Sequence, residues 1–221
     1  MPNPIAFNLY LITDRRQVPG GDLLSAVRAA LRGGVRAVQL REKDLSAREL
    51  LPLARELRML TREFGAKLLI NDRIDVALAT EADGVHLGGH SLPVAEARAL
   101  LGPTKLIGVS THHREEIALA ARAGADFVTF GPVWFTPSKA PYGTPVGLDA
   151  LRQACADAPL PVFPLGGLNV ARLPELLAVG CSRAACIGAI LATPSPESAA
   201  RDLLRLLPAN PLFPPAQTKT R

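Results

Sequence analysis

Short apolar runs recur along the 221 residues, and each of them ends at a polar residue or a glycine. Runs of this kind without polar alternation are typical of parallel strands that are buried on both faces. The pattern predicts eight strands, at residues 8–13, 35–40, 66–71, 84–87, 105–110, 126–131, 161–166 and 184–188.

The segments between these runs have the apolar spacing of amphipathic helices. Ser46 is followed three residues later by Glu49, which is the pattern of a capping box at the start of one helix. The helices are predicted at residues 22–32, 46–64, 73–80, 93–101, 114–123, 147–155, 170–178 and 196–207. Strict alternation of this kind fits either a closed (β/α)₈ barrel or an open doubly wound sheet.

Glycine patterns favour the barrel over the open sheet. No G-x-G-x-x-G follows the first predicted strand, which weakens the dinucleotide-binding form of the open sheet. Glycines recur where helices lead into the next strand, at Gly33, Gly124 and Gly180. With the count of eight units, they predict an α/β protein of one domain, a (β/α)₈ TIM barrel over residues 1–207. The proline-rich segment 208–221 has no periodicity and is expected to be a flexible tail.

Composition excludes several classes of protein. Hydrophobic residues make up 48% of the chain and charged residues 20%, which is typical of a globular protein. No apolar run approaches the ~20 residues of a membrane span, and the first residues do not form a signal-peptide pattern. The net charge of +5 comes from scattered cations, and aromatic residues that could stack on bases are only 5%. We therefore expect small-molecule partners, not nucleic acid or a membrane; a homo-oligomer is compatible with the sequence.

The three cysteines, Cys155, Cys181 and Cys186, form no C-x-x-C pair. We interpret them as unpaired small core residues, most clearly Cys186, which lies within the last predicted strand. Unpaired cysteines fit a reducing compartment, so the sequence predicts a cytoplasmic protein.

In a (β/α)₈ barrel the active site lies at the carboxyl ends of the strands, and charged residues gather there in this sequence. Arg41 and Lys43 flank Glu42 after the second strand, so alternation predicts the two cations on one side and Glu42 on the other. Two converging cations suit a diphosphate, while a salt-bridge network at the rim is the structural alternative. Asn71 and Asp72 supply an amide and a carboxylate oxygen, and Mg²⁺ needs only one or two protein carboxylates when a substrate phosphate completes its shell.

The later strands offer sites for a second anionic group. Gly167 and Gly188 follow the last two strands, where backbone N–H groups commonly hold a phosphate, although glycines also serve as tight turns. Thr136, Ser138 and Lys139 add two hydroxyls and a cation in a loop, or else form a solvated surface. His112 also lies at the predicted mouth and could move protons, whereas no pair of histidines has the spacing of a zinc site.

Eight short motifs occur in a fixed order over about residues 10–200. They are LYLITDR at 9–15, QLREK at 39–43, INDR at 70–73, ADGVHLG at 82–88, IGVSTH at 107–112, FGPVWFTPSK at 130–139, GGLN at 166–169 and IGAI at 187–190. Together they resemble the thiamine phosphate synthase superfamily, which also includes the thiazole tautomerases.

The resemblance implies a Mg²⁺-dependent transferase that condenses 4-amino-2-methyl-5-(diphosphooxymethyl)pyrimidine with a thiazole phosphate. Diphosphate leaves first, and the thiazole nitrogen then attacks the pyrimidine methylene cation. Asp72 would bind Mg²⁺, and the residues implied in catalysis are Arg41, Lys43, Ser110, His112 and Lys139. The implied ligands of the pyrimidine diphosphate are Gln39, Leu40, Arg41, Glu42, Lys43, Asn71, Ser110 and Lys139. Those of the thiazole phosphate are Thr136, Pro137, Ser138, Gly167, Ile187 and Gly188.

One segment departs from the synthase pattern. Synthases usually have a second magnesium carboxylate where this chain has Ser91, and a glutamine where it has Gly89. The pattern HLGxHS is closer to that of tautomerases, in which His112 would be the proton shuttle. QLREK, the Asn71–Asp72 pair and TPSK suit a diphosphate that a tautomerase does not handle, so a synthase is favoured. A tautomerase and a non-catalytic regulator that binds thiamine phosphate remain alternatives.

Overall fold

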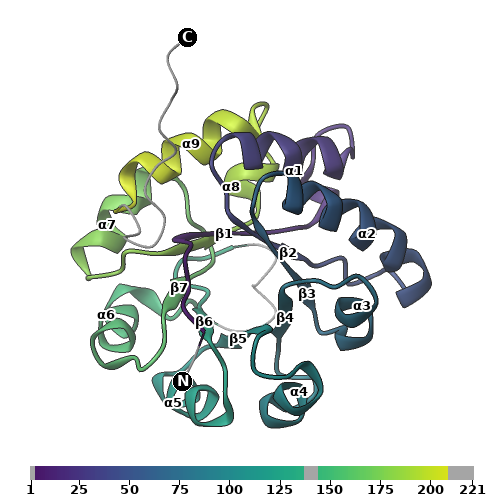
Figure 1. The fold of residues 1–221 in the computed structure, drawn as a ribbon. Coiled ribbons are helices and arrows are strands. Elements are labelled where there is room, and N and C mark those ends of the chain that lie inside the picture. The colour runs from purple at the N-terminus through teal and green to yellow at the C-terminus, as the bar shows by residue number, and fades with distance from the viewer. Residues whose placement is uncertain (1–2, 137–143, 209–221) are drawn as a thin grey trace.

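Eight parallel strands form one sheet that curves into a nearly closed barrel (Figure 1) in the computed structural model, which describes residues 3–136 and 144–208. Hydrogen-bonded neighbours follow the order β7-β6-β5-β4-β3-β2-β1-β8, and β7 and β8 meet where the circle closes. The strands are β1 (Leu9–Ile12), β2 (Ala37–Leu40), β3 (Lys67–Asn71), β4 (Gly84–Leu87), β5 (Leu106–Thr111), β6 (Phe127–Phe130), β7 (Val162–Pro164) and β8 (Ala184–Cys186). The TIM-barrel prediction is confirmed.

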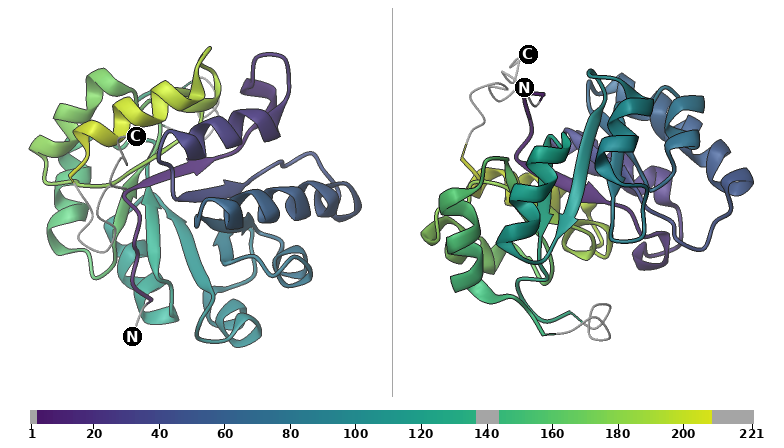
Figure 2. Two further views of the ribbon diagram at one scale, coloured as in Figure 1. Left: turned by 45° about the horizontal axis from the view of Figure 1, so that its top comes forward. Right: turned by 90° about the horizontal axis from the view of Figure 1, so that it is seen from below.

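The helices surround the strands (Figure 1). The last helix packs beside the first, as Figure 2 shows, so the ring of helices closes between these two helices. The capping box predicted at Ser46 and Glu49 is present. The helices are α1 (Leu23–Arg32), α2 (Ala47–Glu63), α3 (Ile74–Ala79), α4 (Val94–Leu101), α5 (Arg114–Ala123), α6 (Gly147–Asp157), α7 (Leu173–Ala178), α8 (Gly188–Leu191) and α9 (Pro196–Leu206), with 3₁₀ turns η1 (Arg15–Gln17) and η3 (Val170–Arg172).

The structure differs from the predicted elements at a few places. The helix predicted over 170–178 is divided into η3 and α7, because Asn169 caps a separate 3₁₀ turn by accepting a hydrogen bond from the Arg172 backbone. The short elements η1 and α8 were not predicted as helices, since three or four residues carry no helical periodicity. Of the predicted tail 208–221, only Pro208 belongs to the described residues, and the domain limits stay a prediction.

Aromatic side chains fill the inside of the barrel. Tyr10, Phe127 and Phe163 pack with ring centroids 5.3 to 6.0 Å apart, and Phe7 joins them from the segment before β1. These rings belong to a separate apolar cluster from the larger layer between the sheet and the helices. The middle of the interior is therefore packed with apolar side chains, and the polar residues predicted for the site lie toward the carboxyl ends of the strands.

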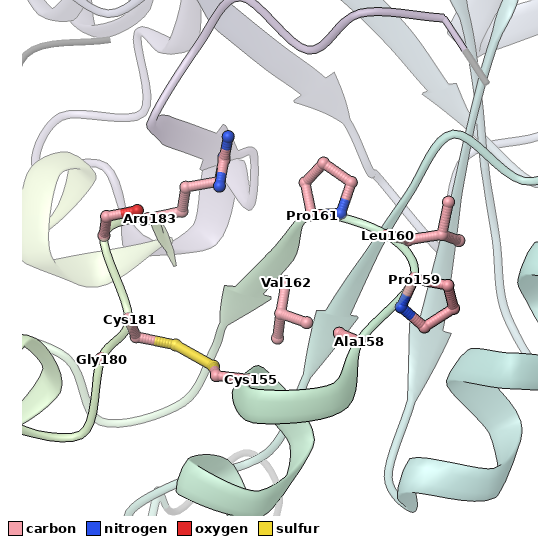
Figure 3. A pocket seen from close by; sticks show the side chains of 10 residues that line it. Cys155, Ala158, Pro159, Leu160, Pro161, Val162, Gly180, Cys181 and Arg183 are labelled. Carbon is pink, nitrogen blue, oxygen red and sulfur yellow. A yellow bond between two sulfur atoms is a disulfide. The ribbon is translucent and has the colours of Figure 1, made fainter. Parts of the chain in front are cut away.

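The structure corrects the expectation that the cysteines are unpaired. Cys155 on α6 and Cys181 in the turn between α7 and β8 form a disulfide (Figure 3). Their Cα atoms lie 6.4 Å apart although 26 positions separate them in sequence, so the fold itself creates the pair. Cys186 is free and buried, as predicted, and burial raises the pKa of its thiol to about 12. The cysteines therefore no longer argue for a reducing compartment, and the cytoplasmic location stays a prediction.

A cavity of about 340 Å³ lies beside this disulfide, lined among others by Pro161, Val162 and Arg183 (Figure 3). Its residues lie at the amino ends of β7 and β8. It is therefore on the face of the barrel opposite to the predicted site. In the part of the chain that the structure describes, no helix has both the length and the apolar character of a membrane span.

Candidate active site

The segments that follow the strands meet at the carboxyl end of the barrel, which we call the mouth. The strand order places β2 and β3 across the barrel from β6 and β7. The cations and carboxylates predicted after β2 and β3 therefore lie opposite the ends of β6 and β7, where Thr136 and Gly167 are predicted to bind a second anionic group. In this arrangement, two charged substrates could bind on opposite sides of the mouth and face one another.

Arg41, Glu42 and Lys43 follow β2, and their side chains differ in burial. The Glu42 side chain is only 2% exposed and turns toward the end of β1, whereas Arg41 is half-buried and Lys43 is exposed. Neither cation forms an ion pair with any described residue. Leu40 packs between the sheet and the helices. Of the predicted substrate ligands, the Leu40 side chain thus packs outside the barrel, and the Glu42 carboxylate is bound by Thr13 and Arg15, so only their backbone could contact a substrate.

Three predicted substrate ligands form a polar layer above the aromatic core. Gln39 on β2 is buried and donates a hydrogen bond from Nε2 to the Tyr10 hydroxyl at 3.1 Å. Asn71 at the end of β3 donates from Nδ2 to the Asp72 carboxylate at 2.6 Å. Ser110 on β5 is half-buried, with its hydroxyl beside a histidine. These contacts fix the amides and the hydroxyl in place before any substrate binds.

That histidine, His86 on β4, was not among the predicted site residues. Its Nε2 lies 3.1 Å from the Ser110 hydroxyl and 3.4 Å from that of Thr129, while its Nδ1 is buried without a hydrogen-bond partner in the part of the chain that the structure describes. Burial lowers its pKa to about 3, so the ring is neutral. Gly108 makes room for it, because a Cβ there would lie 2.6 Å from His86 Nδ1. The one signal in the sequence was a histidine within an apolar strand, which is equally typical of a structural residue.

Asp72 stands at the start of the β3–α3 connection with a φ of 60°, which is uncommon for a residue other than glycine. Ser91, in the segment after β4, donates its hydroxyl proton to Asp72 Oδ1 and accepts a hydrogen bond from the Gly88 backbone at 2.6 Å. Ser91, the position where a second carboxylate was expected, therefore contacts the predicted metal ligand directly. No cluster of three or more potential metal-binding side chains occurs in residues 3–136 and 144–208.

The predicted phosphate ligands follow β6, β7 and β8, and of these strands β8 lies beside β1. Thr136 Oγ1 is buried and has no hydrogen-bond partner among the described residues, so none of them prevents it from acting as a donor. Gly167 has a φ of 70°, and Arg172 donates to its carbonyl at 2.5 Å. Ile187 is the N-cap of α8, which begins at Gly188. Pro137, Ser138 and Lys139 lie outside the described residues.

His112 follows β5 at the mouth and is exposed, as predicted. Its Nδ1 hydrogen-bonds to the Gly131 carbonyl, which requires a proton on that nitrogen and leaves Nε2 as the acceptor in the neutral ring. The Glu116 carboxylate accepts from the His112 backbone at 2.6 Å. The ring is therefore oriented, and its second nitrogen is able to accept or return a proton.

Comparison with known proteins identifies the family. The model of the family described as "Thiamine monophosphate synthase" matches residues 9–190, which is most of the chain. The chain belongs to this family. It is 59% identical to the "Putative thiamine-phosphate synthase" of Geobacter sulfurreducens, over 92% of this chain and 96% of that one. It is 42% identical to the "Thiamine-phosphate synthase" of Roseiflexus castenholzii, over 92% and 91% of the two chains.

A solved structure agrees with these relatives. "Thiamine phosphate pyrophosphorylase from Pyrococcus furiosus" superposes with a TM-score of 0.81 at 36% identity, covering 90% of this chain and 95% of that one. The family and the thiamine-phosphate synthase function expected from the motifs are thereby confirmed, and the chain is a transferase.

Proposed function

We propose that the mouth of this barrel joins 4-amino-2-methyl-5-(diphosphooxymethyl)pyrimidine to a thiazole phosphate, giving thiamine phosphate and diphosphate. One observation carries the assignment of the site: Arg41 and Lys43 have no acidic partner among the described residues, although acidic residues flank Lys43 on both sides. Unpaired cations at a barrel mouth are suited to a highly charged leaving group. The ends of β6, β7 and β8, with Thr136, Gly167 and Gly188, would hold the single phosphate of the second substrate.

We assign Asp72 as the protein ligand of Mg²⁺. Its carboxylate is exposed at the mouth, next to the Asn71 amide and the Ser91 hydroxyl. A site with one carboxylate and nearby neutral oxygens fits Mg²⁺, which commonly takes its remaining ligands from phosphate oxygens and water. When bound, the ion would neutralise charge on the departing diphosphate.

The reaction proposed here is dissociative. The C–O bond to diphosphate breaks first, and the pyrimidine amino group stabilises the methylene cation that remains. The thiazole nitrogen then donates its electron pair to form the new C–N bond. In such a reaction the protein contributes mainly orientation and charge stabilisation. Arg41 and Lys43 would hold the leaving group, while Gln39, Asn71 and Ser110 would orient the pyrimidine ring.

The test compares Asp72→Asn with Asp75→Asn, a neighbouring exposed carboxylate on α3 that pairs with Arg73. Asp72→Asn should reduce the rate of thiamine phosphate formation about a hundredfold or more. It should also weaken binding of inorganic diphosphate in the presence of Mg²⁺, measured by calorimetry. Asp75→Asn should change neither quantity. Equal activity of Asp72→Asn and the wild type would refute the metal assignment.

A thiazole tautomerase is the second candidate, because Ser91 stands where synthases usually have a carboxylate. The wild type incubated with both substrates and Mg²⁺ should release diphosphate. If it instead isomerises a carboxylated thiazole phosphate, and His112→Ala loses that reaction, the tautomerase reading holds. Binding of thiamine phosphate without either reaction would indicate a regulator.

A further inference from the structure

A set of charged hydrogen bonds connects the loop after β1 to the segment after β2. From Arg41 to Asp44 the chain alternates cation, carboxylate, cation, carboxylate. Opposite charges this close attract strongly, and each ion pair formed within the segment would occupy a cation that the diphosphate needs. The structure shows a different pairing, in which arginines of the β1 loop bind both carboxylates.

Glu42 is held by Thr13 and Arg15. Its carboxylate accepts from the Thr13 hydroxyl at 2.7 Å, from the Arg15 backbone at 3.2 Å and from Arg15 Nη1 at 3.0 Å. An ionised carboxylate only accepts, so Thr13 gives its single hydroxyl proton to Glu42. The Thr13 oxygen then accepts the backbone N–H of Arg41 at 2.9 Å. The buried Thr13 thus fixes the main chain at the first of the two cations.

Asp44 is held on the other side of Lys43. Arg15 donates two parallel hydrogen bonds to its carboxylate, at 2.8 and 2.6 Å, and Arg16 adds a third at 2.9 Å. The Arg15 guanidinium keeps the pKa of the Asp44 carboxyl well below its usual range. Paired arginine–carboxylate bonds of this kind define both partners' positions. One guanidinium, that of Arg15, therefore spans the two acidic residues that flank Lys43.

We propose that Arg15 and Thr13 are positioning residues: they bind Glu42 and Asp44, so that Arg41 and Lys43 remain free for the diphosphate of the substrate. This inference deepens the proposed function and rests on its assignment of Arg41 and Lys43 to the diphosphate. It also changes the role predicted for Glu42: its buried carboxylate binds Thr13 and Arg15 and does not contact the substrate.

The first experiment measures Arg15→Gln against Arg28→Gln. Arg28 is the matched control, because it forms an exposed ion pair with Glu63 between α1 and α2 and carries the same charge. Arg15→Gln should bind inorganic diphosphate, in Mg²⁺ buffer, about tenfold more weakly by calorimetry, since the released carboxylates compete for the cations. The KM for the pyrimidine diphosphate should rise to a similar extent, while that for the thiazole phosphate stays within about twofold. Arg28→Gln should match the wild type.

The second experiment separates competition by released carboxylates from simple loss of structure. In Arg15→Gln/Asp44→Asn one competing carboxylate is gone, so diphosphate affinity should recover toward the wild-type value. A purely structural role for Arg15 predicts that the double variant is no better than the single one. Should Arg15→Gln fail to fold, Arg15→Lys keeps the charge but cannot form the paired bonds, and it should show a smaller loss that Asp44→Asn again reverses.

The outcomes distinguish this inference from the proposed function. Folded Arg15→Gln with unchanged diphosphate affinity, or a double variant that recovers nothing, would overturn the positioning role. A wild-type protein that neither binds diphosphate nor forms thiamine phosphate would overturn the proposed function instead.

Discussion

The buried histidine beneath the mouth allows a quantitative prediction of how the free energy of unfolding depends on pH. His86 is 2% exposed, and burial lowers its pKa to about 3, while the same group in an unfolded chain titrates near ~6.5. Between these two values the unfolded state binds a proton that the folded state does not. Stability contributed by the neutral ring is therefore complete above about pH 6.5 and is lost as the pH falls toward 3.

The size of this effect follows from linkage. One proton taken up on unfolding changes the free energy of unfolding by ~1.4 kcal/mol per pH unit well below the unfolded pKa. Integrated from pH 7 to pH 5, the contribution of His86 is a loss of about 2 kcal/mol. The carboxylates with lowered pKa values, such as Glu49 and Glu81, titrate mainly below this window.

The assay is urea unfolding at pH 7 and pH 5 for the wild type, His86→Gln and His90→Gln. His90 is exposed and serves as the control. His86→Gln should lose about 2 kcal/mol less than the wild type between the two pH values, while His90→Gln should behave as the wild type does. Because the comparison is made within each variant, a constant loss of stability in His86→Gln does not affect it. An equal loss in His86→Gln and the wild type would refute the neutral, buried histidine.

Three further predictions concern the glycines and the disulfide. A Cβ in Gly84→Ala would lie 1.9 Å from a backbone carbonyl oxygen of β5, so the free energy of unfolding, measured by thermal unfolding, should fall by about 3 kcal/mol. Gly89→Ala is the control, because there is open space around Gly89 and its stability should not change. Gly167→Ala, at a φ of 70°, should raise the KM for the thiazole phosphate about tenfold without changing that for the pyrimidine diphosphate. Reducing Cys155–Cys181, which closes a loop of 26 positions, should cost about 3 kcal/mol. Thiol titration of the denatured, unreduced chain should give one free cysteine; three would contradict the bond.

Strand positions were predicted well because the signal is local. The run at 84–87 coincides with β4, and the run at 66–71 differs from β3 by one residue. A parallel strand buried on both faces is a nearly continuous apolar run, which stands out among neighbouring polar residues and glycines. The α8 turn at Gly188–Leu191 gives no such signal, since four residues are too short for a helical period.

The candidate site was predicted in part, because the position of a residue along its strand can be read from the sequence but its contacts cannot. Gln39, Asn71 and Ser110 end strands, so the barrel rule alone places them at the mouth. The rule does not say which hydrogen-bond or ion-pair partners a side chain has, and these partners decide whether it can bind a substrate. Glu42 lies among predicted ligands in sequence, yet its carboxylate is bound by Thr13 and Arg15, which follow β1.

By itself the sequence determined the eightfold alternation, the end of the barrel where the polar residues gather and the family to which the chain belongs. These depend on local periodicity and on motifs, which are properties of neighbouring residues. Only the tertiary structure decided that His86 is buried under Ser110, that Cys155 meets Cys181 and that Arg15 spans the acids beside Lys43. Each of these contacts joins segments far apart in the chain, and its energy depends on burial and distance, which exist only once the barrel has closed.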